Sequence, residues 1–169
     1  KYALAMEALQ LAYDRAAEQG LVRLMLLSRT YLGNCCSDLG SMEQLRQHYA
    51  VARRLALALG DEALQTTIDY NLASSQLEQG DAAAAYAYFS GLEAPSVLAL
   101  HKLAICCEKL GKRQEGLAAL DRAETSLAEG EVSPELAAEM LALARFRLER
   151  PDFLQQPEYG ARLLETFAH

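Results

Sequence analysis

The sequence has few of the residues that β-sheet proteins require. Valine, isoleucine and threonine together account for 11 of the 169 residues, there are four prolines and ten glycines, and tryptophan is absent. Strands favour β-branched residues, and the many turns of a sandwich or barrel need glycine or proline, so both folds are disfavoured. Alanine and leucine, which lose little entropy on entering a helix, instead make up 61 residues. The composition therefore predicts an all-α protein.

The sequence also lacks an excess of positive charge. Sixteen lysines and arginines stand against 23 aspartates and glutamates, which leaves a net charge of −7. Binding a phosphate backbone needs the opposite balance, so no direct contact with nucleic acid is expected. The apolar stretches fall far short of the roughly 20 residues that cross a bilayer, and the amphipathic first residues lead us to expect no signal peptide. We therefore expect a soluble, cytoplasmic protein that does not contact a membrane.

Glycines recur at a nearly fixed interval along the chain. Four of them follow one another every 20 residues and two more continue the series: Gly20, Gly40, Gly60, Gly80, Gly111 and Gly130. Between them, apolar residues recur every three or four positions, which is the period of an amphipathic helix. Each glycine stands where a helix C-cap is expected. A unit of about 40 residues divided by a glycine predicts pairs of antiparallel helices, at about 22–39 with 42–59, 62–79 with 82–93, and 97–110 with 113–129.

A common pattern emerges when Gly40, Gly80 and Gly111, the glycines inside the three helix pairs, are aligned. A leucine followed by a small residue precedes each glycine, at Leu32-Gly33, Leu72-Ala73 and Leu103-Ala104. A large residue follows nine positions after it, at Tyr49, Phe89 and Leu120. Small residues let the two helices of a pair approach closely, and the large residues fill the gap to the neighbouring pair.

This pattern resembles the tetratricopeptide repeat family. Leu32-Gly33 and Ala85-x3-Phe89 match the family consensus, whereas Cys36, Gln76 and Cys107 occupy its aromatic site. The long period, with Leu-Gly-Asp at positions 59–61, resembles the extended repeats of bacterial peptide-sensing and transcription-regulating members. The resemblance implies a right-handed superhelix, a solenoid of about nine helices.

The repeat register divides residues 1–169 into a single array. Its parts are the second helix of a truncated repeat (1–20), three repeats (21–60, 61–95 and 96–130) and a degenerate C-terminal capping repeat (131–169). Ser133-Pro134 is a favourable helix start, so the last repeat is expected to contain helices at about 134–149 and 156–168. The chain opens in mid-repeat and without methionine. We therefore expect it to be a fragment of a longer protein.

The sequence contains no arrangement typical of catalysis or metal binding. The cysteines form two adjacent pairs, Cys35-Cys36 and Cys106-Cys107. Adjacent helical residues point about 100° apart, unlike the ligands of a Cys-x-x-Cys site, so buried thiols are the preferred interpretation. There are three histidines, and there is neither a nucleophile elbow nor a glycine-rich phosphate loop. We therefore expect no enzymatic activity, no cofactor and no metal.

The resemblance places a peptide-binding groove along the first helix of each pair. The family's groove positions correspond to Tyr31, Asn34, Asp38, Thr67, Tyr70, Asn71, Ser74, His101 and Lys102. Asparagine offers a donor and an acceptor to the backbone of an extended peptide, and tyrosine offers amphipathic contact area. Lys102 is suited to hold a carboxylate, but Thr30, another groove position, and Leu98 stand where the family's carboxylate clamp has further cations.

We therefore expect a non-catalytic module that binds a peptide or protein segment in its concave groove. The resemblance implies the sensor or assembly part of a bacterial transcriptional regulator. The alternative is a structural scaffold that forms a homodimer through its first helix and holds no groove ligand. Apolar Leu4, Leu9 and Leu11 on that helix favour the alternative.

Overall fold

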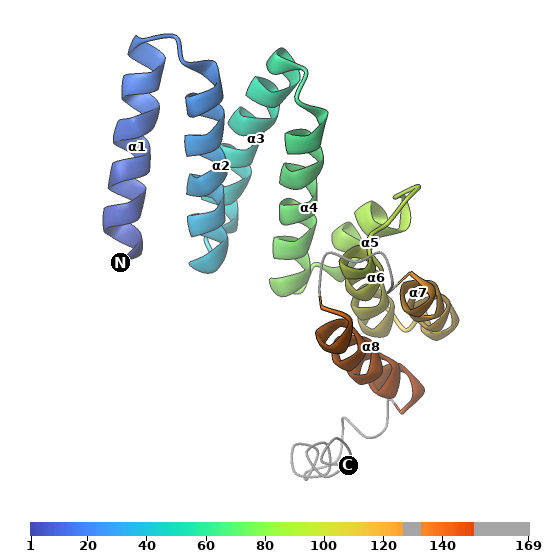
Figure 1. The fold of residues 1–169 in the computed structure, drawn as a ribbon. Helices are drawn as coiled ribbons and strands as arrows, with labels where there is room; N and C mark the ends of the chain where they lie inside the picture. The colour runs from blue at the N-terminus through green and yellow to red at the C-terminus, as the bar shows by residue number, and fades with distance from the viewer. Residues whose placement is uncertain (127–132, 151–169) are drawn as a thin grey trace. The chain divides into compact units, whose positions relative to one another are not determined.

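The computed structural model describes residues 1–126 and 133–150, which form helices and no strand. The helices are α1 (Tyr2–Glu18), α2 (Val22–Asp38), α3 (Met42–Leu59), α4 (Glu62–Glu78), α5 (Ala82–Ser90), α6 (Val97–Lys109), α7 (Arg113–Thr125) and α8 (Pro134–Glu149) (Figure 1). The all-α fold class is confirmed. The helix expected at 156–168 and the glycine at position 130 lie outside the described residues.

Five glycines end their helices in the same way. Gly20, Gly40, Gly60, Gly80 and Gly111 all have positive φ, between 66° and 92°. The amide of the next residue donates to a carbonyl five positions back, as from Ser41 to Cys36 over 2.8 Å. This is the Schellman motif, which needs a left-handed residue and therefore favours glycine. The C-caps expected from the glycine spacing are confirmed at these five positions.

Helix α5 is shorter than the sequence predicts. It was expected to continue to about residue 93, but it ends at Ser90. Gly91 follows directly, and Pro95 cannot continue a helix and disfavours helical geometry in the residue before it. Ser96 then caps α6 by accepting from the amide of Ala99 over 3.2 Å.

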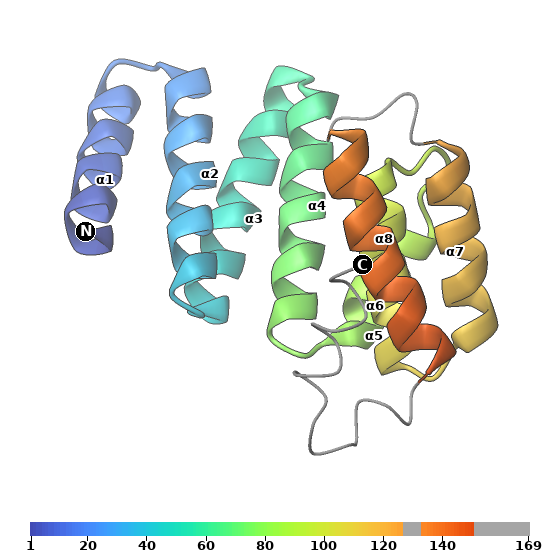
Figure 2. The same cartoon turned by 60° about the horizontal axis from the view of Figure 1, so that its bottom comes forward.

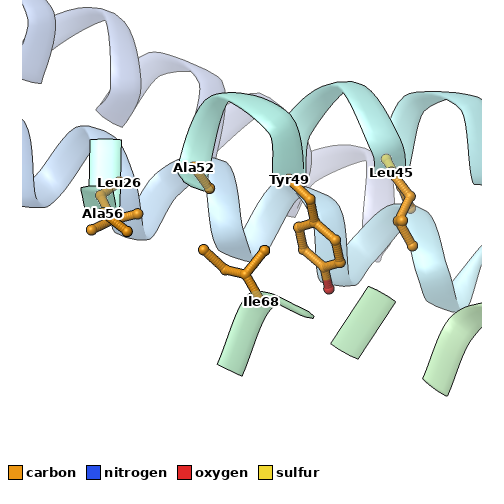
Figure 3. Packing of buried hydrophobic residues seen from close by; sticks show 7 residues of the cluster. Leu26, Leu45, Tyr49, Ala52, Ala56 and Ile68 are labelled. Carbon is orange, nitrogen blue, oxygen red and sulfur yellow. The ribbon is translucent and has the colours of Figure 1, made fainter. Parts of the chain in front are cut away.

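The chain divides into two compact units, Lys1–Ala84 and Ala85–His169. In the first unit, consecutive helices from α1 to α4 run antiparallel to each other, and each packs against the next (Figure 1). Helix α2 also contacts α4. The core of this unit lies where α2, α3 and α4 meet (Figure 3). Its fully buried side chains are Leu26, Cys36, Leu45, Tyr49, Ala52, Ala56 and Ile68.

The leucine-small step of the repeat has a direct packing role in this core. A Cβ added at Gly33 of α2 would collide with the ring of Tyr49 on α3. Glycine therefore lets a large aromatic ring from the second helix approach the backbone of the first. Tyr49 is 2% exposed, so protein atoms surround the ring and leave it little room to shift away from an added Cβ.

The second unit repeats the packing scheme of the first. Helix α6 packs against α7, and both contact α8 (Figure 2), as α2 packs against α3 and both contact α4. A glycine again lies at a close approach, since a Cβ at Gly116 would lie 2.8 Å from Leu148 Cδ1 and 3.0 Å from Cys107 Cβ. A helical repeat is therefore present in both units.

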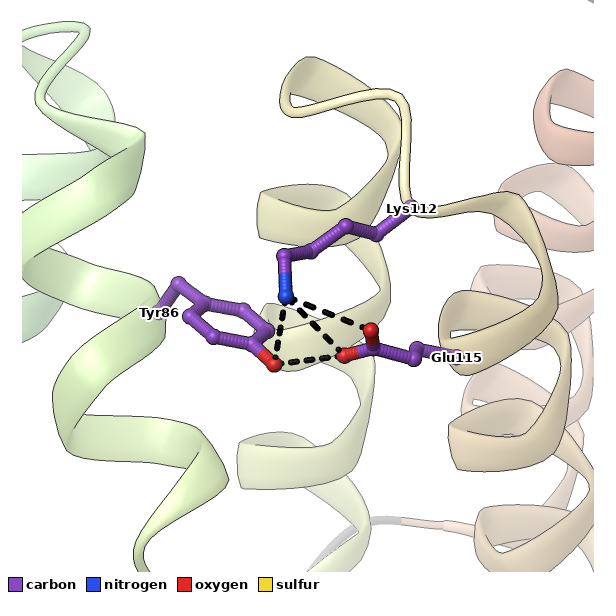
Figure 4. A network of polar contacts seen from close by, with 3 residues as sticks. All are labelled: Tyr86, Lys112 and Glu115. Carbon is purple, nitrogen blue, oxygen red and sulfur yellow. Dashed lines mark hydrogen bonds and ion pairs between the residues drawn. The ribbon is translucent and has the colours of Figure 1, made fainter.

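A polar network connects α5 to the start of α7 within the second unit (Figure 4). Lys112 Nζ donates to Tyr86 Oη over 2.9 Å and to Glu115 Oε1 over 3.2 Å, and the Tyr86 hydroxyl donates to Glu115. The carboxylate of Glu115 is exposed, so water screens its ion pair with Lys112 and weakens the contribution of the pair to stability.

Three of the four cysteines are completely buried, and none of the four forms a disulfide. Burial raises the pKa of the thiols of Cys36 and Cys107, and it raises the pKa of Cys106 to about 11. A raised pKa suppresses the reactive thiolate, which fits the expected packing role. Cys35 is half-buried.

Candidate functional site

A polar pocket of about 400 Å³ opens between α2 and α4 in the first unit. It is lined by Asn34, Ser37, Asp38, Tyr49, Asn71, Ser74, Ser75 and Glu78. Helix α3 packs against both α2 and α4 and supplies Tyr49. We refer to this cavity as the α2–α4 pocket.

Helical periodicity brings the lining residues to one face of each helix. On α2 the lining residues are Asn34, Ser37 and Asp38, which are spaced i, i+3 and i+4. On α4 the corresponding series begins at Asn71 and ends seven positions later at Glu78. Residues three, four and seven apart lie above one another on a helix, so each series presents its polar groups together.

Two asparagine side chains lie side by side in the α2–α4 pocket. Asn34 Oδ1 accepts from Tyr49 Oη at 2.6 Å and from Asn71 Nδ2 at 3.4 Å. Burial raises the pKa of Tyr49 to about 12, and the Asp38 carboxylate adds to the shift, so the phenol keeps its proton at neutral pH. Within the described residues, the Nδ2 group of Asn34 and the Oδ1 atom of Asn71 have no hydrogen-bond partner.

A pair of serine hydroxyls connects the two helices across the same pocket. Ser75 Oγ donates to the carbonyl of Asn71 at 2.9 Å. Because that bond uses its single proton, Ser37 supplies the proton of the 2.6 Å contact between the Ser37 and Ser75 hydroxyls. The neighbouring Ser74 Oγ is shielded from solvent and has no partner in the described structure.

The charged groups of the α2–α4 pocket are carboxylates. Asp38 and Glu78 line it, and the other lining residues are neutral, without a lysine, arginine or histidine among them. The charge of Asp38 also raises the pKa of Tyr2, which lies beside it. The pocket therefore presents hydrogen-bonding groups in a negative electrostatic environment.

Four of the nine predicted site residues line this pocket: Asn34, Asp38, Asn71 and Ser74. Tyr31 is exposed on α2 outside the pocket lining. Thr67 and Tyr70 lie on α4 and are not among the lining residues either, and the Thr67 hydroxyl donates to the carbonyl of Ala63 at 2.9 Å.

The remaining predicted residues, His101 and Lys102, lie on α6 in the second unit. Burial lowers the pKa of His101, and the charges of Lys102 and Arg147 lower it further. Thr30, which the register also places in the groove, is buried, and its hydroxyl donates to the carbonyl of Leu26 at 3.0 Å. The prediction for Thr30 was therefore wrong, because its hydroxyl faces the backbone of its own helix.

The repeat register missed Ser37, Tyr49 and Ser75 as pocket residues. Ser37 follows Asn34 by three positions and Ser75 follows Asn71 by four, so helical spacing from the two asparagines would have found both serines. Tyr49 was assigned to core packing, and its ring does pack there. The Tyr49 hydroxyl on α3 donates to Asn34 on α2, and no local pattern in the sequence indicates this contact between two helices.

The equivalent face of the second unit, between α6 and α8, carries an ion pair instead of a serine pair. Arg147 Nη2 donates to Glu108 Oε1 at 2.8 Å and its Nε donates to the same oxygen at 3.1 Å. Glu108 occupies the position of Ser37 when Gly40 and Gly111 are aligned. The two units therefore share a packing scheme but differ in the chemistry of this face.

The α2–α4 pocket is lined by hydroxyl, amide and carboxylate side chains. Neither a cysteine nor a histidine is among its lining residues, so no serine there has a neighbouring imidazole base. No family model, no curated protein and no solved structure matches this chain. The function of the pocket is therefore inferred from the chemistry of its lining residues.

Proposed function

We propose that this chain is a non-catalytic binding module that holds an extended peptide or protein segment in the α2–α4 pocket. The observation that carries the proposal is the amide pair of Asn34 and Asn71, in which Asn71 Nδ2 donates to Asn34 Oδ1 over 3.4 Å. The pair leaves one amide donor group and one carbonyl acceptor unused. A peptide group offers the complementary acceptor and donor, so a backbone unit of the ligand satisfies both.

The rigidity of the site supports this proposal. Tyr49, which is buried in the core, holds the Asn34 carbonyl through a 2.6 Å hydrogen bond. A fixed side chain loses little conformational entropy when a ligand binds. The cavity volume of about 400 Å³ falls within the range of ligand sites. The resemblance to tetratricopeptide repeats, with their right-handed superhelix, likewise places ligands along the first helices of the pairs.

The proposal is tested by removing the amide pair. An array of 12-residue peptides is probed with the full chain and with its Asn34→Ala/Asn71→Ala variant. We expect the parent chain to bind a subset of peptides and the variant to lose at least ten-fold in affinity, since each lost polar contact contributes about 1 kcal/mol. Binding that is unchanged in the variant contradicts the proposal.

Two controls separate the loss of ligand contacts from loss of folding. Gln47→Ala/Gln114→Ala removes two exposed amides that do not line the pocket, and we expect it to bind like the parent chain. Asn71→Ala alone keeps the hydrogen bond between Tyr49 and Asn34. The single variant therefore tests the site if the double variant does not fold.

Exposed apolar side chains on α1 favour a second candidate, a homodimer. Leu4 is 73% exposed and Leu11 is 59% exposed, and Tyr2 on the same helix is also exposed. Large exposed apolar residues on one helix mark a contact surface. Sedimentation of the parent chain and of a Leu4→Glu/Leu11→Glu variant tests this function. The scaffold function is favoured if the parent chain is a dimer at low micromolar concentration and the Leu4→Glu/Leu11→Glu variant is a monomer. The Asn34→Ala and Asn71→Ala variants should then remain dimers.

A further inference from the structure

The two helices that form the α2–α4 pocket both direct their C-terminal ends to its acidic side. Asp38 is the last residue of α2 and Glu78 is the last residue of α4, and both line the pocket. The C-terminus of a helix carries a partial negative charge of about half an electron. Neither helix has a basic residue in its last turn to offset that charge. The C-terminal end of α2 and the Asp38 carboxylate therefore add their negative charges at the same place.

The same region offers hydrogen-bond acceptors to a ligand. The Oδ1 atom of Asn71 receives no hydrogen bond within the described residues, and the Ser74 hydroxyl is shielded from solvent without a partner. Buried polar atoms in native proteins are nearly always paired, so the shielded Ser74 hydroxyl offers a hydrogen bond to a ligand, and the carbonyl oxygen of the half-buried Asn71 offers another. The charge of Asp38 also reaches the pocket wall, where it adds to the effect of burial in raising the pKa of Tyr49.

We propose that the bound segment carries a cationic group, an ammonium or a guanidinium, that enters the acidic end of the pocket beside Asp38. The donors of this group bind the Asp38 carboxylate and the Asn71 carbonyl oxygen. This inference rests on the proposed peptide-binding function and names its ligand class. A lysine or arginine side chain and a free N-terminal amine share this chemistry. A ligand anchored by its C-terminal carboxylate is repelled.

The experiment uses the full chain and a peptide array in which each parent sequence appears in matched forms. The central residue is lysine, arginine, glutamine or glutamate, and the N-terminus is either free or acetylated. Peptides that bind are then measured in solution by fluorescence polarisation. We expect the lysine and arginine forms to bind about three to five times more tightly than the glutamine form, the range of a partly exposed ion pair. The difference should shrink as salt is added.

The variant Asp38→Asn removes the carboxylate and keeps its shape. We expect this variant to lose the preference for cationic peptides, so that the lysine, arginine and glutamine forms of one peptide bind it with affinities within two-fold of one another. Asp14→Asn, which changes the net charge equally but alters an exposed carboxylate of α1, should keep the preference. A preference that follows the free N-terminus instead of the side chain identifies the amine as the source of the cation.

The outcomes separate this inference from the proposed function. Binding that depends on Asn34 and Asn71 but shows no preference for cations, or favours glutamate, overturns the inference and leaves the peptide-binding function standing. A cation preference that persists in Asp38→Asn also overturns it. The absence of any peptide binding overturns both proposals.

Discussion

Tyr49 connects the core of the first unit to its pocket. The ring packs against Gly33, and the hydroxyl donates to Asn34. The packed ring therefore holds the hydroxyl in place, and the hydroxyl holds the Asn34 amide in the pocket. At the residue scale, the core packing and the proposed binding site share this one side chain.

Substitution of Gly33 tests this contact. Alanine gains about 1 kcal/mol of helix propensity over glycine, but its Cβ collides with a ring that is 2% exposed. We expect Gly33→Ala to lower the free energy of unfolding by about 1–2 kcal/mol net, the usual effect of overpacking. Chemical denaturation followed by circular dichroism measures the change.

A double-mutant cycle supplies the control for Gly33. The smaller side chain in Tyr49→Leu relieves the collision, so Gly33→Ala should cost less in that background than in the parent chain. Additive effects, or stabilisation by Gly33→Ala in the parent, would show that the ring does not lie against Gly33.

Thiol labelling tests the burial of the cysteines. Cys36, Cys106 and Cys107 are buried with raised pKa values, whereas Cys35 is half-buried. We expect one thiol to react rapidly with an aromatic disulfide reagent at pH 7.5, and all four to react after denaturation. The fast phase should disappear in Cys35→Ser. Several fast thiols in the folded parent chain would contradict the structure.

Part of the pocket lining could be predicted from the sequence, whereas the hydrogen bonds that join the helices around the pocket could not. Asn34, Asp38, Asn71 and Ser74 were expected from the groove positions that the tetratricopeptide resemblance implies, and all four line the α2–α4 pocket. The hydroxyl of Tyr49 and the hydrogen bond between Ser37 and Ser75 join different helices. Such contacts depend on how far one helix is shifted along the next, and no periodicity within a helix specifies that shift. Thr30 was misplaced for a related reason, since its hydroxyl bonds to its own backbone.

At the element scale, the glycine series specifies where helices end. The bounds of α2, α3 and α4 lie within about a residue of those expected, since a glycine in left-handed geometry stops each helix at a defined place. The end of α5 was less predictable. No glycine of the series ends it, and its termination depends on Gly91 and on the proline four residues later.

Three helices of the first unit meet at Arg29. Its guanidinium lies 3.8 Å from the ring centre of Tyr13 on α1 and contacts His48 Nδ1 on α3 at 3.1 Å. Because arginine can only donate, Nδ1 must accept, and the imidazole in this contact is neutral. Burial and the Arg29 charge both lower the pKa of His48 below its usual 6.5.

This contact predicts a dependence of stability on pH. The pKa of His101 is also lowered, so the unfolded chain binds more protons than the folded chain as the pH falls below about 6.5. The histidine contribution to stability is therefore fully present above pH 6.5 and decreases below it, until the folded histidines also titrate. Denaturant midpoints measured from pH 7.5 to 5.5 should fall, and less so in His48→Gln. An equal slope in both proteins would contradict the role of His48.

At the scale of the whole molecule, one packing scheme appears in both units with different surface chemistry. The first unit places hydroxyls and amides between α2 and α4, whereas the second joins α6 to α8 through Arg147 and Glu108. Repetition of the scheme could be predicted from the aligned glycines. The divergence could not, because paired and unpaired polar residues look alike in a sequence until their partners on other helices are known.

None of the described helices has the length and apolar character needed to span a membrane. Among the same residues, no group of three or more histidine, cysteine, aspartate or glutamate side chains is placed to hold a metal ion. The functional proposal rests on the polar α2–α4 pocket of the first unit.

The most direct test of that proposal is to observe the side-chain amides of Asn34 and Asn71 while a ligand binds. The full chain is labelled with ¹⁵N and titrated with the tightest peptide from the array, and the amide resonances are assigned with single asparagine variants. We predict saturable shifts of both side-chain amides, together with backbone amides of α2 and α4 that face the pocket. Shifts confined to α1, or peptide binding that leaves both asparagine side chains unchanged, would contradict the account.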